Sequence, residues 1–467
     1  MYPEFFNDVF GPVMQPGSSS HTAGPCRLGY LAHCLLKGEL KSITVRIDPD
    51  GSFSGTFGVM FEDLGMLSGA YGLLPDDKRI FDIKEILRKS GISFNFEYTD
   101  LGRANHPNAV EFVLENDRGE SISLLGISTG GGMVETVEVM GKPFKYKGDR
   151  FIDEYPFTPV LPIRYNDEIK PQLFDSMAGW RKIAQSEHKT LAETAVEYEK
   201  RASGKSAGEL YDHMNKLRDI MDRQTRAVYE EEARPLENGY SGFHYRKWEE
   251  YTRDHVVLSG EHSAKVIRNI LGVQAQIPGV AMVPGPMGTG GGFLYSALKE
   301  AAAKLGSTSE EITDALFVAA GIGAICYTRS SPTGEVTGCA GECGVCSAMT
   351  AGAITYLAKG TAEQVEAAAS LALQMSLGWP CDPIPGGQNQ PCFSRFITAI
   401  EMATVFADLA LSGRDAVLPF HEVVDVMDRM GKEMPGCYKC TSKGATCTAP
   451  AALRISEEFK KKMNARQ

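Results

Sequence analysis

The sequence lacks an excess of positive charge: its 467 residues include 48 Lys and Arg against 59 Asp and Glu, for a net charge of −11. This balance argues against nucleic acid or an anionic membrane surface as the main partner. The first residues contain no basic segment followed by an apolar one, so we expect no secretory signal. The longest apolar stretch, residues 315–327, is too short to cross a bilayer core of about 30 Å. We therefore expect a cytoplasmic protein.

An internal repeat, a low-complexity tail and a lysine in a recognisable pyridoxal-phosphate context are also missing. The eleven cysteines are an odd number, which fits poorly with a complete set of disulfides. In the absence of a secretory signal they indicate a reducing compartment, where cysteines serve metal binding or catalysis. With 43% hydrophobic and 23% charged residues, the composition is that of an ordinary soluble globular protein.

The length predicts more than one domain, and local patterns divide the chain into three parts. The first part mixes a strand at 42–48, a helix at 82–91 and a hairpin turn at 117–120. The fold class is therefore α+β, an N-terminal α+β domain followed by a largely all-α catalytic domain. The predicted parts are an α+β domain over 1–150, a connector and helical segment over 151–235, and an all-α domain over 236–467.

Helical patterns dominate from residue 191 onward. The first of them, over 191–233, is interrupted at Gly204. Further along, Ala-, Gly- and Met-rich segments indicate packed, largely buried helices with Gly-rich joints, and no strand hairpin stands out there. The predicted helices of this region are 310–324, 348–358, 361–377 and 395–411.

Three cysteines stand in Gly- or Pro-rich turns of the C-terminal half. They are Cys339 in Thr-Gly-Cys-Ala-Gly-Glu, Cys381 in Cys-Asp-Pro-Ile-Pro-Gly, and Cys392 in Asn-Gln-Pro-Cys. Such turns present a thiolate beside open backbone. Three thiolates can hold three irons of a [4Fe–4S] cluster and leave the fourth iron free to act as a Lewis acid on a substrate hydroxyl. The alternative is that they are reduced thiols buried in the core.

The N-terminal segment 16–25, Pro-Gly-Ser-Ser-Ser-His-Thr-Ala-Gly-Pro, gathers hydroxyl groups at a predicted helix start. Side-chain hydroxyls and backbone N–H groups at such a position form a ready anion site. His21 lies inside the segment, and histidine is the side chain best suited to move protons near neutral pH. The alternative is an N-cap turn that contains a hydrogen-bonded histidine.

Both segments resemble the iron–sulfur L-serine dehydratases. That family carries Gly-Cys-x-Gly-Glu-x-Gly, then Cys-Asp-Pro, then Pro-Cys in its α-type domain, and Ser-Ser-Ser-His-Thr-x-Gly-Pro in its β-type domain. The segments His106-Pro-Asn108 and 128–132, Ser-Thr-Gly-Gly-Gly, match two further β-type features. The resemblance covers most of residues 10–455, in the β-then-α order of single-chain members, and it is weakest between 150 and 235.

The resemblance implies a function and a set of site residues. It implies a hydro-lyase that removes water from a β-hydroxy acid, with L-serine deaminated to pyruvate and ammonia. An oxygen-sensitive [4Fe–4S] cluster would be held by Cys339, Cys381 and Cys392, with one iron free for substrate. His21 would be the base or would orient it. Substrate binding would fall to Ser18, Ser19, Ser20, Thr22, His106 and Asn108, and to Arg395, which could neutralise cluster or substrate charge.

The sequence departs from the family at positions that could read the substrate. The loop 283–292 keeps its glycines but lacks the family's Asn, Ala340 replaces a Gln, and Phe396 replaces an Asn. No histidine stands near 55–63, where the family has one. A site loses discrimination when it loses polar contacts. A dehydratase of another hydroxymethyl acid, such as 2-(hydroxymethyl)glutarate, therefore stays open, as do a non-catalytic iron–sulfur redox sensor and an inactive homologue with structural zinc.

The remaining cysteines have no single assignment from sequence. Cys437, Cys440 and Cys447 could bind zinc, carry redox chemistry, approach the cluster or simply pack, and Cys440 replaces the Glu of the family's Tyr-Lys-Glu-Thr-Ser. Cys346 has helical Ala and Met neighbours and is expected to pack. We expect a small-molecule partner; a homodimer is one assembly we consider, although the sequence does not define the oligomeric state.

Overall fold

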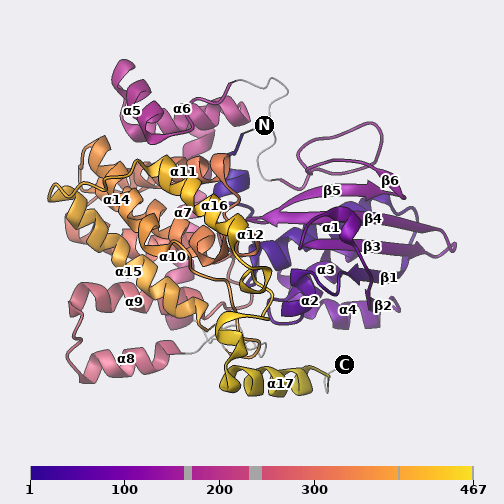
Figure 1. Ribbon diagram of the computed structural model, residues 1–467. Helices are drawn as coiled ribbons and strands as arrows, with labels where there is room; N and C mark the ends of the chain where they lie inside the picture. The colour runs from indigo at the N-terminus through magenta and orange to yellow at the C-terminus, as the bar shows by residue number, and fades with distance from the viewer. Residues whose placement is uncertain (1, 162–170, 231–243, 388–389, 465–467) are drawn as a thin grey trace.

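The computed structural model describes residues 2–161, 171–230, 244–387 and 390–464. A mixed sheet with its covering helices forms one part of the molecule, and a larger group of helices forms the other (Figure 1). The predicted α+β fold class is confirmed. Parts of the predicted connector and of the all-α segment, residues 162–170, 231–243, 388–389 and 465–467, lie outside the described residues.

The sheet has six strands in the order β2-β1-β3-β4-β5-β6. Only the β1–β2 pair is parallel, and the other neighbours are antiparallel. The hairpin predicted around 117–120 is confirmed as β3 and β4, with Val113 opposite Ser123. The strands are β1 (Leu40–Ile47), β2 (Ser93–Tyr98), β3 (Ala109–Asn116), β4 (Ser121–Gly130), β5 (Met133–Val139) and β6 (Lys142–Pro143).

Four helices belong to the sheet part and pack on it with their apolar side chains. Leu28 and Leu31 of the first helix and Met66 of the third are fully buried against the sheet residues Val45 and Phe112. The predicted helix at 82–91 is confirmed. The helices are α1 (Gly24–Leu35), α2 (Ser52–Thr56), α3 (Glu62–Tyr71) and α4 (Ile83–Lys89).

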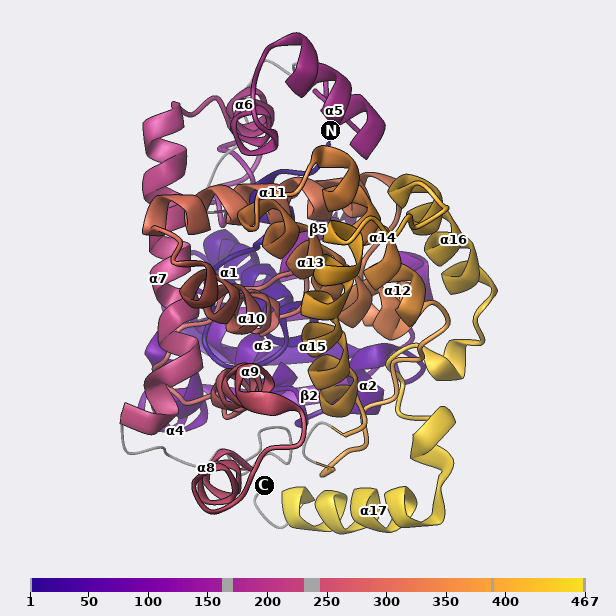
Figure 2. The same ribbon diagram turned by 90° about the vertical axis from the view of Figure 1, so that its left-hand side faces the viewer.

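The other part is built from helices around the Ala- and Gly-rich α11 and α13, which the views of Figures 1 and 2 place among their neighbours. All four helices predicted beyond residue 300 are confirmed, and Gly204 ends α6 in the left-handed conformation as the interruption predicted. The helices are α5 (Met177–Ser186), α6 (Leu191–Ser203), α7 (Ala207–Glu230), α8 (His244–Asp254), α9 (Gly260–Gln274), α10 (Gly290–Leu305), α11 (Ser309–Arg329), α12 (Gly334–Cys339), α13 (Val345–Leu357), α14 (Ala362–Ser376), α15 (Cys392–Leu411), α16 (Phe420–Glu433) and α17 (Pro450–Asn464).

The α11 helix corrects one expectation from the sequence. The apolar stretch was predicted to be too short to span a membrane. The helix that contains it runs for 21 residues and, by length and composition alone, is long and apolar enough to cross one. Polar residues at both ends lengthen it beyond the apolar run. Of its most apolar window, 72% is buried inside the protein, which is the behaviour of a core helix.

The chain begins in the helical part before it enters the sheet part. A single π-helical turn, Phe5–Val9, buries Phe5, Phe6 and Val9 in the same apolar core as α6 and α11. The chain then crosses to the sheet through residues 10–18. A second such turn, Ser19–Ala23, leads directly into α1. The hydroxyl-rich segment therefore lies where the two parts meet.

Candidate active site

A small cavity lies at the junction of the two parts. Its volume is about 30 Å³. One side is polar and comes from the turn before α1, and the other side carries thiols and carboxyls from the helical part. The lining residues are Ser18, Ser20, His21, Met60, Met287, Gly288, Glu335, Glu342, Cys381, Cys392, Phe396 and Cys440.

The three cysteines singled out in the sequence lie in one continuous group of thiols. The Cys392 thiol lies close enough to those of Cys339 and Cys381 for each of them to act on its pKa. The group extends at each end, because the Cys339 and Cys343 sulfurs are 2.9 Å apart and Cys440 acts on the pKa of Cys381. All five thiols are buried. Cys339 at the end of α12, the Cys381 segment and Cys392 at the start of α15 thus converge, although they are separate in the sequence.

Tight backbone contacts hold two of these turns together. Gly338 has φ of 64° and lies inside α12, where its conformation breaks the helix. A Cβ atom at this position would stand 2.3 Å from the Trp379 carbonyl oxygen. The same carbonyl accepts a hydrogen bond from the Cys339 N–H at 2.9 Å. Only glycine fits both the dihedral angle and the close approach.

The segment 437–447, here called the C-terminal strap, lies along the Cys381 turn. The Cys381 N–H donates to the Tyr438 carbonyl, and the Cys440 N–H donates to the Cys381 carbonyl, each at 2.8 Å. The fully buried Asp382 connects the Cys381 turn to α15 and to the C-terminal strap. It accepts from the Arg395 guanidinium at 2.5 Å and from the Thr446 hydroxyl at 2.6 Å.

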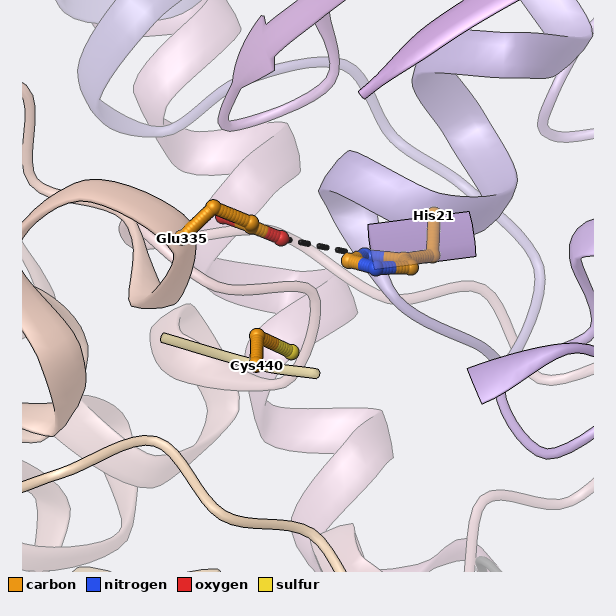
Figure 3. A group of neighbouring side chains, drawn as sticks. All are labelled: His21, Glu335 and Cys440. Atoms are coloured by element: carbon orange, nitrogen blue, oxygen red, sulfur yellow. Dashed lines mark ion pairs between the residues drawn. The ribbon is translucent and has the colours of Figure 1, made fainter. Parts of the chain in front are cut away.

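His21 joins the two parts of the protein. Its Nδ1 lies 2.8 Å from the Ser20 hydroxyl and 3.2 Å from Glu335 Oε1 of α12 (Figure 3). Its Nε2 lies 2.9 Å from the Ser52 hydroxyl, which itself donates to the Cys440 carbonyl at 2.8 Å. Because the Ser52 proton is used there, Ser52 accepts from Nε2–H. In the neutral ring this assignment leaves the lone pair on Nδ1, where it accepts the proton of the Ser20 hydroxyl.

The electrostatics of the cavity separate its titratable groups. Burial lowers the pKa of His21, and the Glu335 carboxylate opposes part of that shift. Burial, followed by the charge of Glu335, raises the pKa of Glu342 well above the usual carboxyl range. Hydrogen bonds from Cys339 and Cys381 hold the pKa of Cys392 well below that of an ordinary thiol. The cavity thus combines an imidazole of lowered pKa, a carboxyl of raised pKa and a thiol of lowered pKa.

The other predicted site residues are placed in different ways. Ser18 and Ser20 line the cavity. The Ser19 hydroxyl instead donates to the Pro286 carbonyl at 3.3 Å, and the Thr22 hydroxyl donates to the Met60 carbonyl. These two side chains therefore fix the turn against its neighbours.

His106, Asn108 and Arg395 lie around the cavity rather than in its lining. The Asn108 N–H hydrogen bonds with His106 Nδ1 at 3.1 Å, and the charge of Glu335 acts on His106. The Asn108 side chain is close enough to hydrogen bond with Glu335. Arg395 hydrogen bonds with the Pro380 carbonyl and Asp382, so it supports the Cys381 turn. Their roles in binding substrate stay predictions.

Sequence reasoning missed three residues of the site. Glu335 and Ser52 complete the environment of His21, and Glu342 lines the cavity. Cys440, for which an approach to the cluster was one of several alternatives, also lines the cavity. Glu342 lies in the same Gly-Glu motif that holds Cys339, and Glu335 comes four residues before that cysteine, so both could have been suspected. Ser52 gives no local signal, because its place depends on how the two parts pack.

The residues present fit an iron–sulfur cluster by their chemistry. Buried cysteine sulfurs gathered in one group are the soft donors that iron–sulfur clusters require. His21, Glu335 and Cys440 also form a group whose ligand atoms all lie within 4.8 Å of one another. A metal cofactor is thus supported by the donor set.

Comparison with known proteins adds an independent finding. The family model described as "Serine dehydratase alpha chain" matches residues 186–446. The L-serine dehydratase beta chain of Peptoniphilus asaccharolyticus is 33% identical over 151 residues, which are 32% of this chain and 67% of that protein.

Two longer matches extend the likeness. The probable L-serine dehydratase alpha chain of Bacillus subtilis is 27% identical over 292 residues, 62% of this chain and 95% of that protein. The L-serine dehydratase of Mycobacterium bovis is 25% identical over 471 aligned residues, 94% of this chain and 96% of that protein. The chain is thus similar both to separate alpha and beta chains and to a single-chain relative.

Proposed function

The chain belongs to the serine dehydratase family and is a lyase, and we propose that it removes water from a β-hydroxy amino acid. The substrate that we propose first is L-serine. The observation that carries this proposal is the cavity in which His21 and Glu335 face the thiols of Cys381 and Cys392. Elimination of water needs a base at one carbon and an acid at the neighbouring hydroxyl. This cavity brings groups for both tasks together.

For the cofactor we propose a [4Fe–4S] cluster held by Cys339, Cys381 and Cys392. When bound, it would supply a Lewis acid for the departing hydroxyl group. The burial of all three thiols, with those of Cys381 and Cys392 in the cavity lining, supports this assignment. Arg395 and Asp382 would keep the Cys381 turn in place beneath the cluster.

For the proton transfer we propose His21 as the base, acting at Nδ1. Ser52 keeps the proton of the neutral ring on Nε2, and burial keeps the ring neutral. When Nδ1 takes the α-proton of the substrate, the new positive charge forms 3.2 Å from Glu335. The carboxylate stabilises that charge, which lowers the barrier. Loss of the β-hydroxyl from serine then leaves an enamine, which hydrolyses to pyruvate and ammonia.

Ser18 and Ser20 are the best placed groups for the substrate carboxylate. Their side chains line the cavity, and Ser18 caps the turn that begins at Ser19. Hydroxyl and N–H donors at the start of a helical turn favour an anion. The Ser20 hydroxyl lies 2.8 Å from His21 Nδ1 and 2.9 Å from Glu335 Oε1, so it connects the anion site to the proton-transfer pair.

One observation supports a second candidate substrate. Met60, Met287 and Phe396 give the cavity an apolar side, and Phe396 stands where the family has an Asn. The dicarboxylate 2-(hydroxymethyl)glutarate could place on this side the two methylene groups that lie between its carboxylates. The same elimination chemistry would serve both substrates.

The test is a substrate panel with the anaerobically reconstituted protein. L-serine should give pyruvate and ammonia in equal amounts. Loss of water from 2-(hydroxymethyl)glutarate, without release from serine, would transfer the proposal to the second substrate. Absence of turnover with every β-hydroxy acid, in protein that carries a complete cluster, would contradict it.

We also propose the setting in which the enzyme acts. Its buried free thiols and the proposed oxygen-sensitive cluster suit a reducing cytoplasm. We retain the division into parts at 1–150, 151–235 and 236–467 as a proposal. Neither the first nor the last part alone carries both the base and the cluster cysteines, so separately expressed halves should be inactive.

A further inference from the structure

A second cavity, here called the helix-end pocket, lies in the helical part and has a volume of about 460 Å³. Its walls come from α5, the first turns of α14, the last turn of α15 and the loop 412–419 that leads into α16. Both views place α5 above α14 at the same end of the helical part (Figures 1 and 2). The pocket shares no lining residue with the cavity around His21. Its volume falls in the range of about 300–1,000 Å³ that is typical of small-molecule sites.

Two buried polar groups stand in the wall of the helix-end pocket. Glu366 of α14 is 7% exposed, pairs with the Arg181 guanidinium of α5 at 2.7 Å and accepts from the Phe420 N–H at 3.1 Å. His421 Nδ1 is buried and has no hydrogen-bond partner among the described residues. A buried polar atom without a partner costs free energy, and a polar ligand in the pocket would supply the partner.

The loop 412–419 is held in an unusual conformation beside the pocket. Val417 has φ of 67°, a left-handed value that is an outlier for a β-branched residue. Asp415 accepts from the Val417 N–H at 2.9 Å, and Ser370 of α14 donates to the Leu418 carbonyl at 2.7 Å. Val417 is 80% exposed, so the loop presents this side chain at the pocket rather than in the core. Conformations of this kind persist where the surroundings hold them, and they concentrate at ligand-binding and other functional sites.

The pocket combines charges of both signs with apolar walls. Arg414 is exposed and forms no ion pair among the described residues. Exposed carboxylates of Glu363 and Asp415 also line the pocket, and the charge of Arg181 acts on Glu363. Alanines of α5, α14 and α15 form much of the remaining wall. A site for a simple anion would not carry carboxylates, and a site for a simple cation would not carry guanidinium groups. The combination fits a zwitterion with an apolar side chain.

The pocket lies at the far ends of the helices that lead to the cysteine segments. α14 begins at the pocket and ends at Ser376, shortly before Cys381. α15 begins with Cys392 and ends beside the pocket at Leu411. α16 begins beside the pocket at Phe420 and leads to the C-terminal strap. A helix of 20 residues is about 30 Å long. A ligand in the pocket would therefore be remote from the active-site cavity and still contact helices that position it.

We propose that the helix-end pocket binds an α-amino acid with an apolar side chain, and that its occupancy is transmitted along α14 and α15 to the Cys381 and Cys392 segments. The guanidinium groups bind the carboxylate, the exposed carboxylates bind the ammonium group, and the loop 412–419 covers the side chain. His421 Nδ1 gains a partner in either charged group, according to its tautomer. Rigid helices packed on one another carry such a change over this distance. The inference does not depend on the proposed reaction.

Isothermal titration calorimetry on the full-length protein tests the site, with L-valine, L-leucine and L-phenylalanine as probes. Two fragments of leucine separate the charge contacts: 4-methylpentanoate lacks the ammonium group, and 3-methylbutylamine lacks the carboxylate. Ala178→Phe places a ring in the pocket from an exposed position of α5, and Ala178→Ser is its control because it leaves the pocket open. Arg414→Ala removes a charge from the lining, and Arg429→Ala removes an exposed one from α16 outside it.

At least one amino acid should bind equally to the wild type, Ala178→Ser and Arg429→Ala. Arg414→Ala should weaken binding about fivefold, the upper range for an exposed charge pair, because Arg181 remains. Ala178→Phe should not bind, and each fragment should bind at least about tenfold more weakly than leucine. No binding of any probe by the wild type, or equal binding by Ala178→Phe, would overturn the site. Equal binding of leucine and 4-methylpentanoate would overturn the amino-acid class of the ligand.

Amide hydrogen exchange tests the transmission. The bound amino acid should slow exchange in the loop 412–419 and also in residues 376–381, and it should do neither in Ala178→Phe. Slowing confined to the loop would overturn the transmission along the helices. Neither measurement uses turnover, so a protein that binds the amino acid but dehydrates no β-hydroxy acid would overturn the proposed function alone.

Discussion

His21 and Glu335 come from opposite parts of the protein and meet at 3.2 Å between Nδ1 and Oε1, and both side chains are buried. Moving such a pair out of water costs free energy that can offset the attraction between its members, so stabilisation of the fold is a weak explanation for this pair. Its location in a cavity that also holds thiols makes proton transfer the better explanation. Perturbed titratable groups concentrate at functional sites.

Replacing His21 tests the base directly. His21→Ala should lower kcat on the order of 10² or more, the usual scale of general acid–base catalysis. The iron and sulfide content of the reconstituted protein should stay unchanged, because His21 is not assigned as a ligand. Steady-state kinetics and metal analysis on the same preparation check both statements. Loss of the cluster together with the activity would instead point to His21 as a metal ligand.

Replacing Glu335 tests the electrostatic relationship. The base must be neutral, so activity rises with pH as His21 loses its proton. Glu335 raises the pKa of His21 against the effect of burial. Glu335→Gln removes that charge, so the acid limb of the kcat profile should move to lower pH, while kcat on the plateau falls about tenfold, the equivalent of one pKa unit or ~1.4 kcal/mol.

Glu342→Gln is the matched control for that experiment. Glu342 lines the same cavity, where burial and then the charge of Glu335 raise its pKa well above the usual carboxyl range. Because the pKa of His21 is shifted by burial and by Glu335 rather than by Glu342, this replacement should leave the position of the acid limb unchanged. A limb that shifts equally in both variants would mean that the effect of Glu335→Gln is not due to its charge.

Gly338 offers a test of how the cysteine turns are held. Gly338→Ala forces a left-handed conformation on a residue with a Cβ and brings that atom to 2.3 Å from the Trp379 carbonyl. We expect a loss of about 1–3 kcal/mol in the free energy of unfolding, from backbone strain, together with reduced iron binding. Gly306→Ala is the control, because Gly306 has φ of 69° but no atom within 4 Å of the added Cβ. Chemical denaturation of both should show the larger loss at 338.

The local elements of this fold could be predicted from the sequence, because their signals are local. Alternating apolar and polar residues predicted β1, the turn at 117–120 predicted the β3–β4 hairpin, and Gly204 predicted the end of α6. The cysteine turns were recognised by their glycines and prolines. These features depend on residues a few positions apart.

The parts of the site that the sequence left unassigned or open depend on contacts between distant segments. Ser52 reaches His21 only because α2 packs against the C-terminal strap, where a Cβ on Gly55 would stand 2.4 Å from the Thr441 carbonyl. Cys440 reaches the cavity through backbone pairing with Cys381. The packing of residues 5–10 in the helical core likewise rests on the burial of Phe5 and Phe6 against residues that come much later in the chain. No periodicity within those segments encodes their partners.

The central claim is that one site, built from both parts of the chain, eliminates water with the help of a cluster on Cys339, Cys381 and Cys392. The most direct measurement is pyruvate formation from L-serine, with iron and sulfide content determined on the same anaerobic samples of wild type and Cys381→Ala. We expect a wild type that carries the cluster and is active, and a Cys381→Ala protein that has lost the cluster and the activity together. A Cys381→Ala protein that keeps full iron and sulfide content, or that still releases pyruvate at the wild-type rate, would contradict it.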